Sequence, residues 1–352
     1  MGHPDVCIAG AGIIGLSLAL ELTRRGARVI ILDRGPALGE ASLAAAGMLA
    51  GKDPSNPPLL QPLSDLSLSL YPAFLDHIAN LSDLRVPFQT ELTLQATAIP
   101  SVNSISRSDL DIFLPAHNLG SLPITLVDEH SIDPRQLASA LLAAAGNTSI
   151  ELLTDSPVLG VESKGSDLTV IIGDDRLHPA HFVDCTGAWA VTRPGSVTPR
   201  KGQMLSVALP QSSPLWLVLR TDDLYVVPRI TGPHAGRAVI GATVEEAGFD
   251  KTVHASDIER LRKGAVHLLP ALANAPVLEQ WAGLRPATRD ELPLLGADIS
   301  NPHHLFATGH FRNGILLAPA TAHLLTQIIL GEQPEIDLAP FAPGRFILDP
   351  IA

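Results

Sequence analysis

Cysteine is scarce in this sequence, with two residues among 352. Two cysteines in a chain of this size cannot form a disulfide framework, which favours a reducing, cytoplasmic setting. Basic residues are also in deficit, since 24 lysines and arginines stand against 36 acidic residues, for a net charge of −12. A nucleic-acid partner requires a basic face, so this charge argues against that class of function.

Long apolar runs and metal-ligand patterns are missing as well. The longest late apolar stretch, residues 314–330, is broken by Pro319, His323 and Gln327. It predicts an amphipathic helix, and no membrane span is expected. The first residues lack the basic start of a signal peptide. The histidines are scattered without metal-ligand spacing, so we expect no metal.

What the sequence does contain is a dinucleotide-binding pattern at its start. Residues 5–9 form a short apolar run, typical of a buried parallel strand. The next six residues, 10–15, read GAGIIG and match G-x-G-x-x-G. A helical pattern capped by Gly26 follows, and a second strand at residues 28–32 ends in Asp33.

Each glycine of this motif has a physical role. Gly10 and Gly12 let the backbone turn tightly and approach a pyrophosphate, and Gly15 lets the helix pack closely on the strand. The helix N-terminus faces the anion, and Asp33 lies near the place where a ribose hydroxyl needs an acceptor. An ordinary glycine turn would explain less of this arrangement. The motif does not choose between NAD and FAD.

Three later segments carry further signals. Small side chains dominate residues 40–50 and would let the backbone run beside an extended ligand, although a plain helix would accept these alanines equally well. A strand at residues 182–185, containing Cys185, leads into a tight turn at Thr186 and Gly187. In "ATGHFRNGILLAP", residues 307–319, Arg312 stands in a turn that would otherwise favour a small polar residue.

These segments and five others give the chain a family resemblance. It resembles the ThiO-type glycine oxidases of the D-amino-acid oxidase superfamily of FAD enzymes. The matching motifs occur in the family's order and span nearly the whole chain, while residues 50–130 match weakly. They are GAGIIG at 10–15, EASLAAAGML at 40–49, CTGAW at 185–189, KGQML at 201–205, YVVPR at 225–229, GATVEEAGFD at 241–250, GLRPATRDELPLLG at 283–296 and ATGHFRNGILLAPATA at 307–322.

The resemblance implies an α/β fold. A glutathione-reductase-like FAD-binding domain, Rossmann-type with a parallel sheet, would be interleaved with an α+β substrate domain that has an antiparallel sheet. We expect the FAD-binding domain at residues 1–85, 131–195 and 283–352, and the substrate-binding domain at 86–130 and 196–282. The sequence agrees with alternating strands at 88–96, 204–207, 225–228 and 238–241. It also predicts a helix near 137–142, with Asp133 or Ser131 as N-cap and Pro134 just inside.

The resemblance also implies the FAD contacts, most of them through the backbone. Attachment is expected to be non-covalent, because Cys7 and Cys185 both lie inside predicted strands. N–H groups after Gly309 would face the flavin and favour its anionic reduced form. With the glycine motif and the Thr186-Gly187 turn included, the expected contacts are Gly10, Gly12, Ile13, Ile14, Gly15, Asp33, Arg34, Ala41, Ser42, Ala46, Gly47, Met48, Val158, Thr186, Gly187, His310, Phe311, Arg312, Asn313, Gly314, Ile315 and Leu316.

In this family, the counterparts of Arg285 and Arg312 lie over the flavin near the substrate carboxylate. A guanidinium donates two parallel hydrogen bonds to a carboxylate, so Arg285 is expected to be the principal clamp and Arg312 a second contact. Alternatively, Arg285 forms a surface salt bridge with Asp290 or Glu291, and Arg312 binds a backbone carbonyl. Tyr225 matches a family tyrosine near the substrate, or it is a half-buried strand aromatic.

The implied reaction is oxidation of a small amine. A hydride passes from Cα to flavin N5, the imine hydrolyses to a 2-oxo acid and ammonia, and oxygen reoxidises the flavin with release of hydrogen peroxide. The flavin carries the chemistry, so no catalytic acid or base is expected, including His310. The resemblance also implies a role in making the thiazole ring of thiamine. Family members are often homo-oligomers, but no stretch here shows an interface.

Two departures from the family pattern bear on the substrate. Asp223 replaces a histidine before Tyr225, and Val244 replaces a methionine. An acid at position 223 could bind an ammonium group or repel an acidic substrate, and Val244 could leave room for a side chain. Glycine is the first expectation, with sarcosine and small D-amino acids as alternatives. Other readings are a D-amino-acid dehydrogenase with a non-oxygen acceptor and a non-catalytic flavin-binding protein, whereas an NAD-dependent dehydrogenase would not explain the turn at 309–314.

Overall fold

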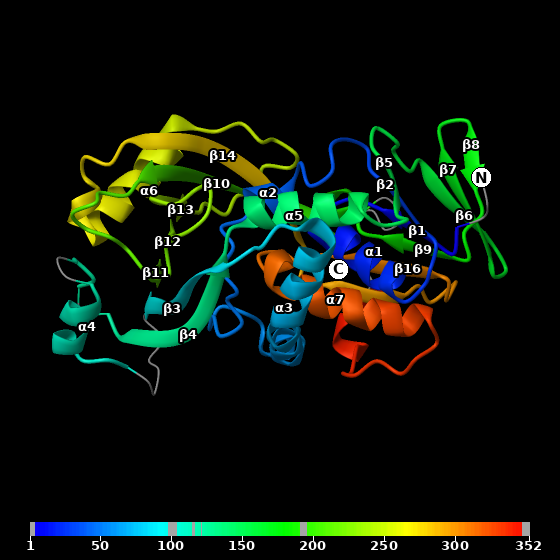
Figure 1. The fold of residues 1–352 in the computed structure, drawn as a ribbon, viewed down its shortest axis with the longest axis horizontal. Coiled ribbons are helices and arrows are strands. Elements are labelled where there is room, and N and C mark those ends of the chain that lie inside the picture. The colour runs from blue at the N-terminus through cyan, green and yellow to red at the C-terminus, as the bar shows by residue number, and fades with distance from the viewer. Residues whose placement is uncertain (1–3, 98–103, 115–116, 121, 191–195, 347–352) are drawn as a thin grey trace.

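The computed structural model describes residues 4–97, 104–114, 117–120, 122–190 and 196–346. Figure 1 shows an elongated molecule whose two ends are built on different β-sheets. A six-stranded, mainly parallel sheet and a small three-stranded sheet occupy one end, and a seven-stranded, mainly antiparallel sheet occupies the other.

Short apolar runs build the six-stranded sheet, as buried parallel strands require. β1 (Val6–Ala9) lies inside it, and all four of its residues are buried. It pairs in parallel with β2 (Val29–Leu32) on one side and with β9 (His181–Asp184) on the other. The strand order is β15-β16-β9-β1-β2-β5, and the remaining strands are β5 (Glu151–Leu153), β15 (Leu294–Ala297) and β16 (His304–Thr308).

Different layers cover the two faces of this sheet. One large apolar cluster joins it to four helices, α1 (Ile13–Arg24), α3 (Gln61–Ser82), α5 (Pro134–Gly146) and α7 (Gly314–Ile329). On the other face, Cys7 packs against the small sheet, which consists of β6 (Gly160–Lys164), β7 (Asp167–Ile172) and β8 (Asp175–Leu177). α5 begins as predicted, because a carboxylate oxygen of Asp133 accepts a hydrogen bond from the N–H of Arg135 at 3.0 Å.

The late helix departs from its predicted character. The sequence predicted an amphipathic helix at residues 314–330, but α7 is buried along most of its length, including Pro319. It packs against both α1 and α3. Its polar positions are accommodated individually, as where the buried Thr321 hydroxyl meets His310 at 3.0 Å.

The second sheet presents two different faces. Its strand order is β14-β10-β13-β12-β11-β3-β4. One face packs in an apolar cluster with α6 (Ala255–Leu268), and the other meets Ala46 through Val218, Val227 and Val239. The strands are β3 (Phe88–Ala96), β4 (Ile124–Ile132), β10 (Thr198–Ala208), β11 (Val218–Thr221), β12 (Tyr225–Arg229), β13 (Arg237–Gly241) and β14 (Val277–Ala287).

The chain passes between the two ends more than once, as the expected interleaving requires. β3, β10, β12 and β13 confirm the four strands predicted in the substrate domain. β14 runs four residues beyond the expected boundary at residue 283, to Ala287, and so carries Arg285 on the antiparallel sheet. The expected domain limits at residues 1, 195 and 352 lie outside the described residues.

Short helices complete the described part of the chain. Within it, no helix is long and apolar enough to cross a membrane. The short helices are α2 (Ala41–Ala44), α4 (Arg107–Phe113), and the 3₁₀ turns η1 (Pro58–Leu60), η2 (Gly187–Trp189), η3 (Pro270–Leu272), η4 (Ala339–Phe341) and η5 (Pro343–Phe346).

Candidate active site

The turn between β1 and α1 can be built only with glycine at two places. Gly10 has a φ of +101°, and a Cβ there would collide with the carbonyl of Cys185. A Cβ on Gly15 would collide with the carbonyl of Gly10. The missing side chains therefore bring β1, α1 and the end of β9 into direct backbone contact, leaving the helix N-terminus open to an anion.

Side chains from later segments fix this turn. The carboxylate of Asp33, at the end of β2, accepts a hydrogen bond from the N–H of Ala11 at 2.6 Å. The Ser42 hydroxyl accepts one from the N–H of Ile13 at 3.0 Å. The guanidinium carbon of Arg34 lies 3.6 Å from the ring centroid of Trp189, a stacking contact that the sequence did not reveal.

A large cavity runs from this turn to the antiparallel sheet. It encloses about 1780 Å³ of empty space including its open mouth. All the cofactor- and substrate-binding residues expected from the sequence lie within the described residues. All of them except Gly15 and Leu316 line this cavity. Gly15 lies behind the turn, and the buried Leu316 uses its carbonyl to accept a hydrogen bond from the Ser67 hydroxyl at 2.6 Å.

The strand predicted around Cys185 ends one residue early. β9 stops at Asp184, whose carboxylate accepts a hydrogen bond from the N–H of Thr186 at 3.0 Å and so turns the chain. Cys185 is thus the first residue of the turn and lines the cavity, although it is buried. Burial raises the pKa of its thiol well above the usual value and that of Cys7 to about 12. Both thiols are therefore protonated at neutral pH.

Arg285 lies at the antiparallel-sheet end of the cavity. Its Nη1 donates a hydrogen bond to the carbonyl of Thr243 at 3.1 Å. Within the described residues, no carboxylate lies at ion-pair distance from it, and Asp290, the alternative partner, pairs with Arg345 at 2.8 Å. Burial lowers the pKa of Arg285, and the nearby charge of Arg312 adds to this effect, but an arginine remains charged at neutral pH.

Tyr225, on β12, lies beside this guanidinium. Burial raises the pKa of the Tyr225 phenol, and the charge and hydrogen bond of Arg285 oppose that rise. The phenol is therefore protonated at neutral pH and can donate a hydrogen bond. Glycine at position 241 makes room for it, since a Cβ there would lie 2.5 Å from the phenol oxygen.

The turn after β16 brings the other expected clamp to the same cavity. The N–H of Phe311 donates a hydrogen bond to the carbonyl of Pro286 at 2.7 Å, which ties the turn to the strand of Arg285. Arg312 itself is exposed, and its Nη2 donates to the carbonyl of Ser55 at 3.1 Å. This is the backbone contact that the sequence left open as an alternative. Arg312 nevertheless lines the cavity and lies near enough to Arg285 for their charges to interact.

His310 is buried beneath this turn. Burial lowers the pKa of its imidazole to about 3, so the ring is neutral at neutral pH. Its Nε2 lies 3.0 Å from the Thr321 hydroxyl. The ring is thus neutral and held inside the fold, and the absence of an acid or base role for His310 stays a prediction.

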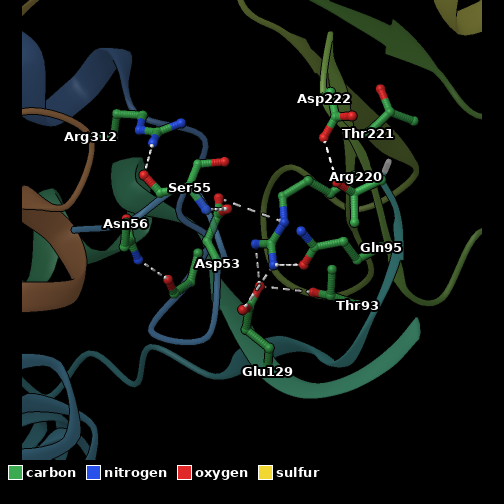
Figure 2. Close-up of polar contacts among 12 residues, drawn as sticks. Asp53, Ser55, Asn56, Thr93, Gln95, Glu129, Arg220, Thr221, Asp222 and Arg312 are labelled. Carbon is green, nitrogen blue, oxygen red and sulfur yellow. Dashed lines mark hydrogen bonds and ion pairs between the residues drawn. The ribbon is translucent and has the colours of Figure 1, made fainter. Parts of the chain in front are cut away.

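Sequence analysis missed an acidic group that the fold brings to the cavity. Asp53 lines it, and Figure 2 shows the loop carrying Asp53 and Ser55 between two arginines. On one side Arg312 binds Ser55, and on the other the Nε of Arg220 lies 3.8 Å from the carboxylate of Asp53. Arg220 also binds Glu129 at 2.7 Å, so two carboxylates share one guanidinium. The only sequence signal was a Gly-, Pro- and Asn-rich loop after residue 50.

The two departures noted in the sequence lie away from this region. Asp223 and Val244, both among the described residues, do not line the cavity. Asp223 is exposed, and Val244 has an exposed fraction of 62%. The expectations that Asp223 would meet the substrate and that Val244 would enlarge the pocket are therefore not supported by their positions.

A family model described as FAD dependent oxidoreductase (DAO) matches residues 5–328. The chain belongs to this family. FAD is accordingly its cofactor, and the residues fit it, because the glycine turn leaves no room for side chains where a pyrophosphate must approach. The recognised family, the fold class and the FAD cofactor are thereby confirmed.

Individual relatives agree with this assignment. The chain is 35% identical over 372 residues to the bifunctional protein ThiO/ThiG of Trichormus variabilis. The alignment covers 97% of this chain and 55% of that protein. The chain therefore spans about half the length of this relative. It is 30% identical to the glycine oxidase of Bacillus licheniformis, covering 93% of each chain. The crystal structure of glycine oxidase from Geobacillus kaustophilus superposes with a TM-score of 0.90 at 28% identity, covering 97% of this chain and 99% of that one.

Proposed function

We propose that this protein oxidises glycine, or another small amine with a carboxylate such as sarcosine or a small D-amino acid, with oxygen as the electron acceptor. The observation that carries the proposal is Arg285, a guanidinium that lines the same cavity as the dinucleotide turn. It donates a hydrogen bond to the carbonyl of Thr243 and interacts with the Tyr225 phenol, but no carboxylate of the described residues lies at ion-pair distance from it. The ThiO-type resemblance is the sole support for a role in thiamine thiazole synthesis.

Arg285 would bind the substrate carboxylate. A planar guanidinium offers several N–H donors, and a charge-assisted pair of bonds would fix both the position and the orientation of the substrate. The protonated Tyr225 phenol would donate to the same carboxylate, and Arg312 would contribute a second positive charge. Holding the substrate in the cavity that also holds FAD supplies the proximity that the reaction needs.

FAD supplies the two-electron acceptor, so that the substrate loses a hydride from Cα and a proton from its amine, and oxygen finally takes up both electrons as hydrogen peroxide. The imine product hydrolyses to a 2-oxo acid and ammonia, or to a 2-oxo acid and methylamine where the substrate is sarcosine. We assign no protein acid or base to this step, because the flavin carries the chemistry.

Asp53 would set the charge that the substrate can carry. Its side chain is only 13% exposed, and the nearby Arg220 is shared with Glu129. The cavity thus presents an incompletely neutralised carboxylate on the loop next to Arg312. A second carboxylate on the substrate would be repelled there, so we expect a preference for amino acids with one carboxylate.

The test is anaerobic mixing of the FAD-bound protein with glycine, sarcosine, small D-amino acids and a diacid such as iminodiacetate. Bleaching of the flavin absorption by glycine or another mono-acid, and peroxide release when air is admitted, are the expected results. A protein that rejects added FAD, or one whose flavin none of these amines reduces, would refute the proposal. Reduction without peroxide under air would instead indicate a dehydrogenase with another acceptor.

A further inference from the structure

A second depression lies on the antiparallel sheet, on the face that also carries Tyr225. β-strand side chains alternate, so Tyr225, Val227 and Arg229 of β12 share that face. Val227 packs with Val239 and Ala46 in an apolar cluster between the two polar ends. The Arg229 end opens into a depression of about 350 Å³, including its mouth, at the start of α5.

Arg229 is buried there with an unmet hydrogen bond. Its exposed fraction is 4%, its Nη2 donates to the carbonyl of Ala46 at 2.8 Å, and its Nε lies 3.8 Å from a carboxylate oxygen of Asp133. Its Nη1 has no hydrogen-bond partner among the described residues. A buried guanidinium N–H left without an acceptor is costly, so such a group points to an acceptor that the protein itself does not provide.

A second buried donor lines the same depression. The Ser206 hydroxyl of β10 belongs to a residue with 3% exposure and also has no partner in the described part of the chain. Arg237 of β13 lines it too, and no ion pair joins its guanidinium to any described carboxylate. β12 and β10 therefore direct two unmatched donors to one place, and β13 adds the charge of Arg237.

The acidic residues of the depression are already engaged. Asp133 caps α5 and accepts a hydrogen bond from His234 Nδ1 at 2.6 Å, while Glu279 pairs with Arg135 at 2.7 Å. Three arginines line the depression against these two carboxylates. Counted over these five side chains alone, the net charge of the depression is +1, and the two unmatched donors lie beside it. A small anion matches both the charge and the donors.

We propose that this depression is a binding site for a small oxyanion, such as inorganic phosphate or a short carboxylate, held by Arg229, Arg237 and Ser206. It is distinct from the cavity of Arg285, since the apolar cluster of Ala46, Val227 and Val239 separates the two. The bound anion accepts hydrogen bonds from Arg229 Nη1 and the Ser206 hydroxyl and is neutralised by Arg237.

The site is tested by calorimetric titration of the FAD-bound protein with phosphate and with acetate at matched ionic strength. Saturable 1:1 binding of either anion at this site is expected. The anion that binds shows whether the natural ligand is a phosphate or a short carboxylate. Arg237→Gln and Ser206→Ala are the test variants because both keep Arg229 in place. Replacing Arg229 would also remove its hydrogen bond to the carbonyl of Ala46. We expect Arg237→Gln to weaken binding about tenfold or more and Ser206→Ala to weaken it severalfold.

Two controls separate this site from other cationic surfaces. Arg260→Ala removes an exposed arginine on α6, and Arg285→Ala removes the proposed substrate clamp. Neither should change the affinity for phosphate, whereas acetate, being a carboxylate, can also bind Arg285. Absence of saturable binding in the wild-type protein overturns the proposal even if a variant fails to fold. It is equally overturned if the affinity is unaffected by Arg237→Gln and Ser206→Ala, or is lost in Arg285→Ala.

Discussion

Replacing Gly202 with alanine should displace the Arg285 guanidinium directly. Gly202 lies on β10, next to β14, and the three atoms nearest to a Cβ built there all belong to that guanidinium. The collision is too close to be tolerated, and the far end of a flexible side chain yields more easily than two paired strands. The variant should therefore keep its fold while Arg285 loses its present position.

The magnitude follows from the bonds that Arg285 makes. Moving the group forfeits its hydrogen bond to Thr243 and its alignment with a substrate carboxylate. Charge-assisted hydrogen bonds contribute about 1.5–3 kcal/mol, so KM for glycine should rise about 10- to 100-fold. Affinity for FAD should change little, because Gly202 does not line the cavity among the described residues.

Peroxide release at varied glycine concentration gives KM, and flavin absorption gives the FAD content. Gly160→Ala is the matched control, since a Cβ there meets only Ile171 at 3.7 Å, an ordinary contact. The double variant Gly202→Ala with Arg285→Ala should bind substrate no worse than Arg285→Ala alone, because the displaced group is already gone. An unchanged KM in Gly202→Ala, or additive losses in the double variant, would refute the reasoning.

Two further predictions concern the charges around the cavity. Asp53→Asn should raise the ratio of kcat/KM for iminodiacetate to kcat/KM for glycine about fivefold, because it relieves about 1 kcal/mol of repulsion. An unchanged ratio, measured over a panel of substrates, would show that Asp53 does not determine specificity. His310 has a pKa of about 3 in the fold against a usual 6.5, so the unfolded chain alone takes up its proton between these values. The contribution of His310 to the free energy of unfolding is therefore fully present above about pH 6.5 and is lost on acidification. The loss is about 2 kcal/mol at pH 5. Urea unfolding at pH 7 and 5 should show a smaller loss for His310→Gln than for wild type, and equal losses would contradict this account.

The sequence predicts local features well because their causes are local. The glycine turn at residues 10–15, the Asp33 acid at the end of β2 and the Asp133 cap of α5 are each marked by a short run of residues in the sequence. Their burial pattern and turn chemistry can be read from a few positions. For the same reason, most of the residues expected to contact FAD line the cavity.

Features set by distant packing could not be predicted in this way. Asp53 reaches the cavity on a loop that Arg312 and Arg220 contact from two sides, and neither contact is visible in the sequence. The burial of α7 depends on α3, which comes from a segment without a family motif. Arg229 belonged to a recognised motif, but its unmatched Nη1 becomes visible only when β12 is placed against Ala46.

Substrate binding by Arg285 is tested most directly by anaerobic flavin reduction in Arg285→Ala, Arg285→Lys and Arg289→Ala, the last an exposed arginine outside the cavity. The glycine concentration for half-maximal reduction should rise about tenfold or more in Arg285→Ala, recover partly in Arg285→Lys and stay unchanged in Arg289→Ala, with flavin content equal in all. A wild-type value in Arg285→Ala would contradict the account.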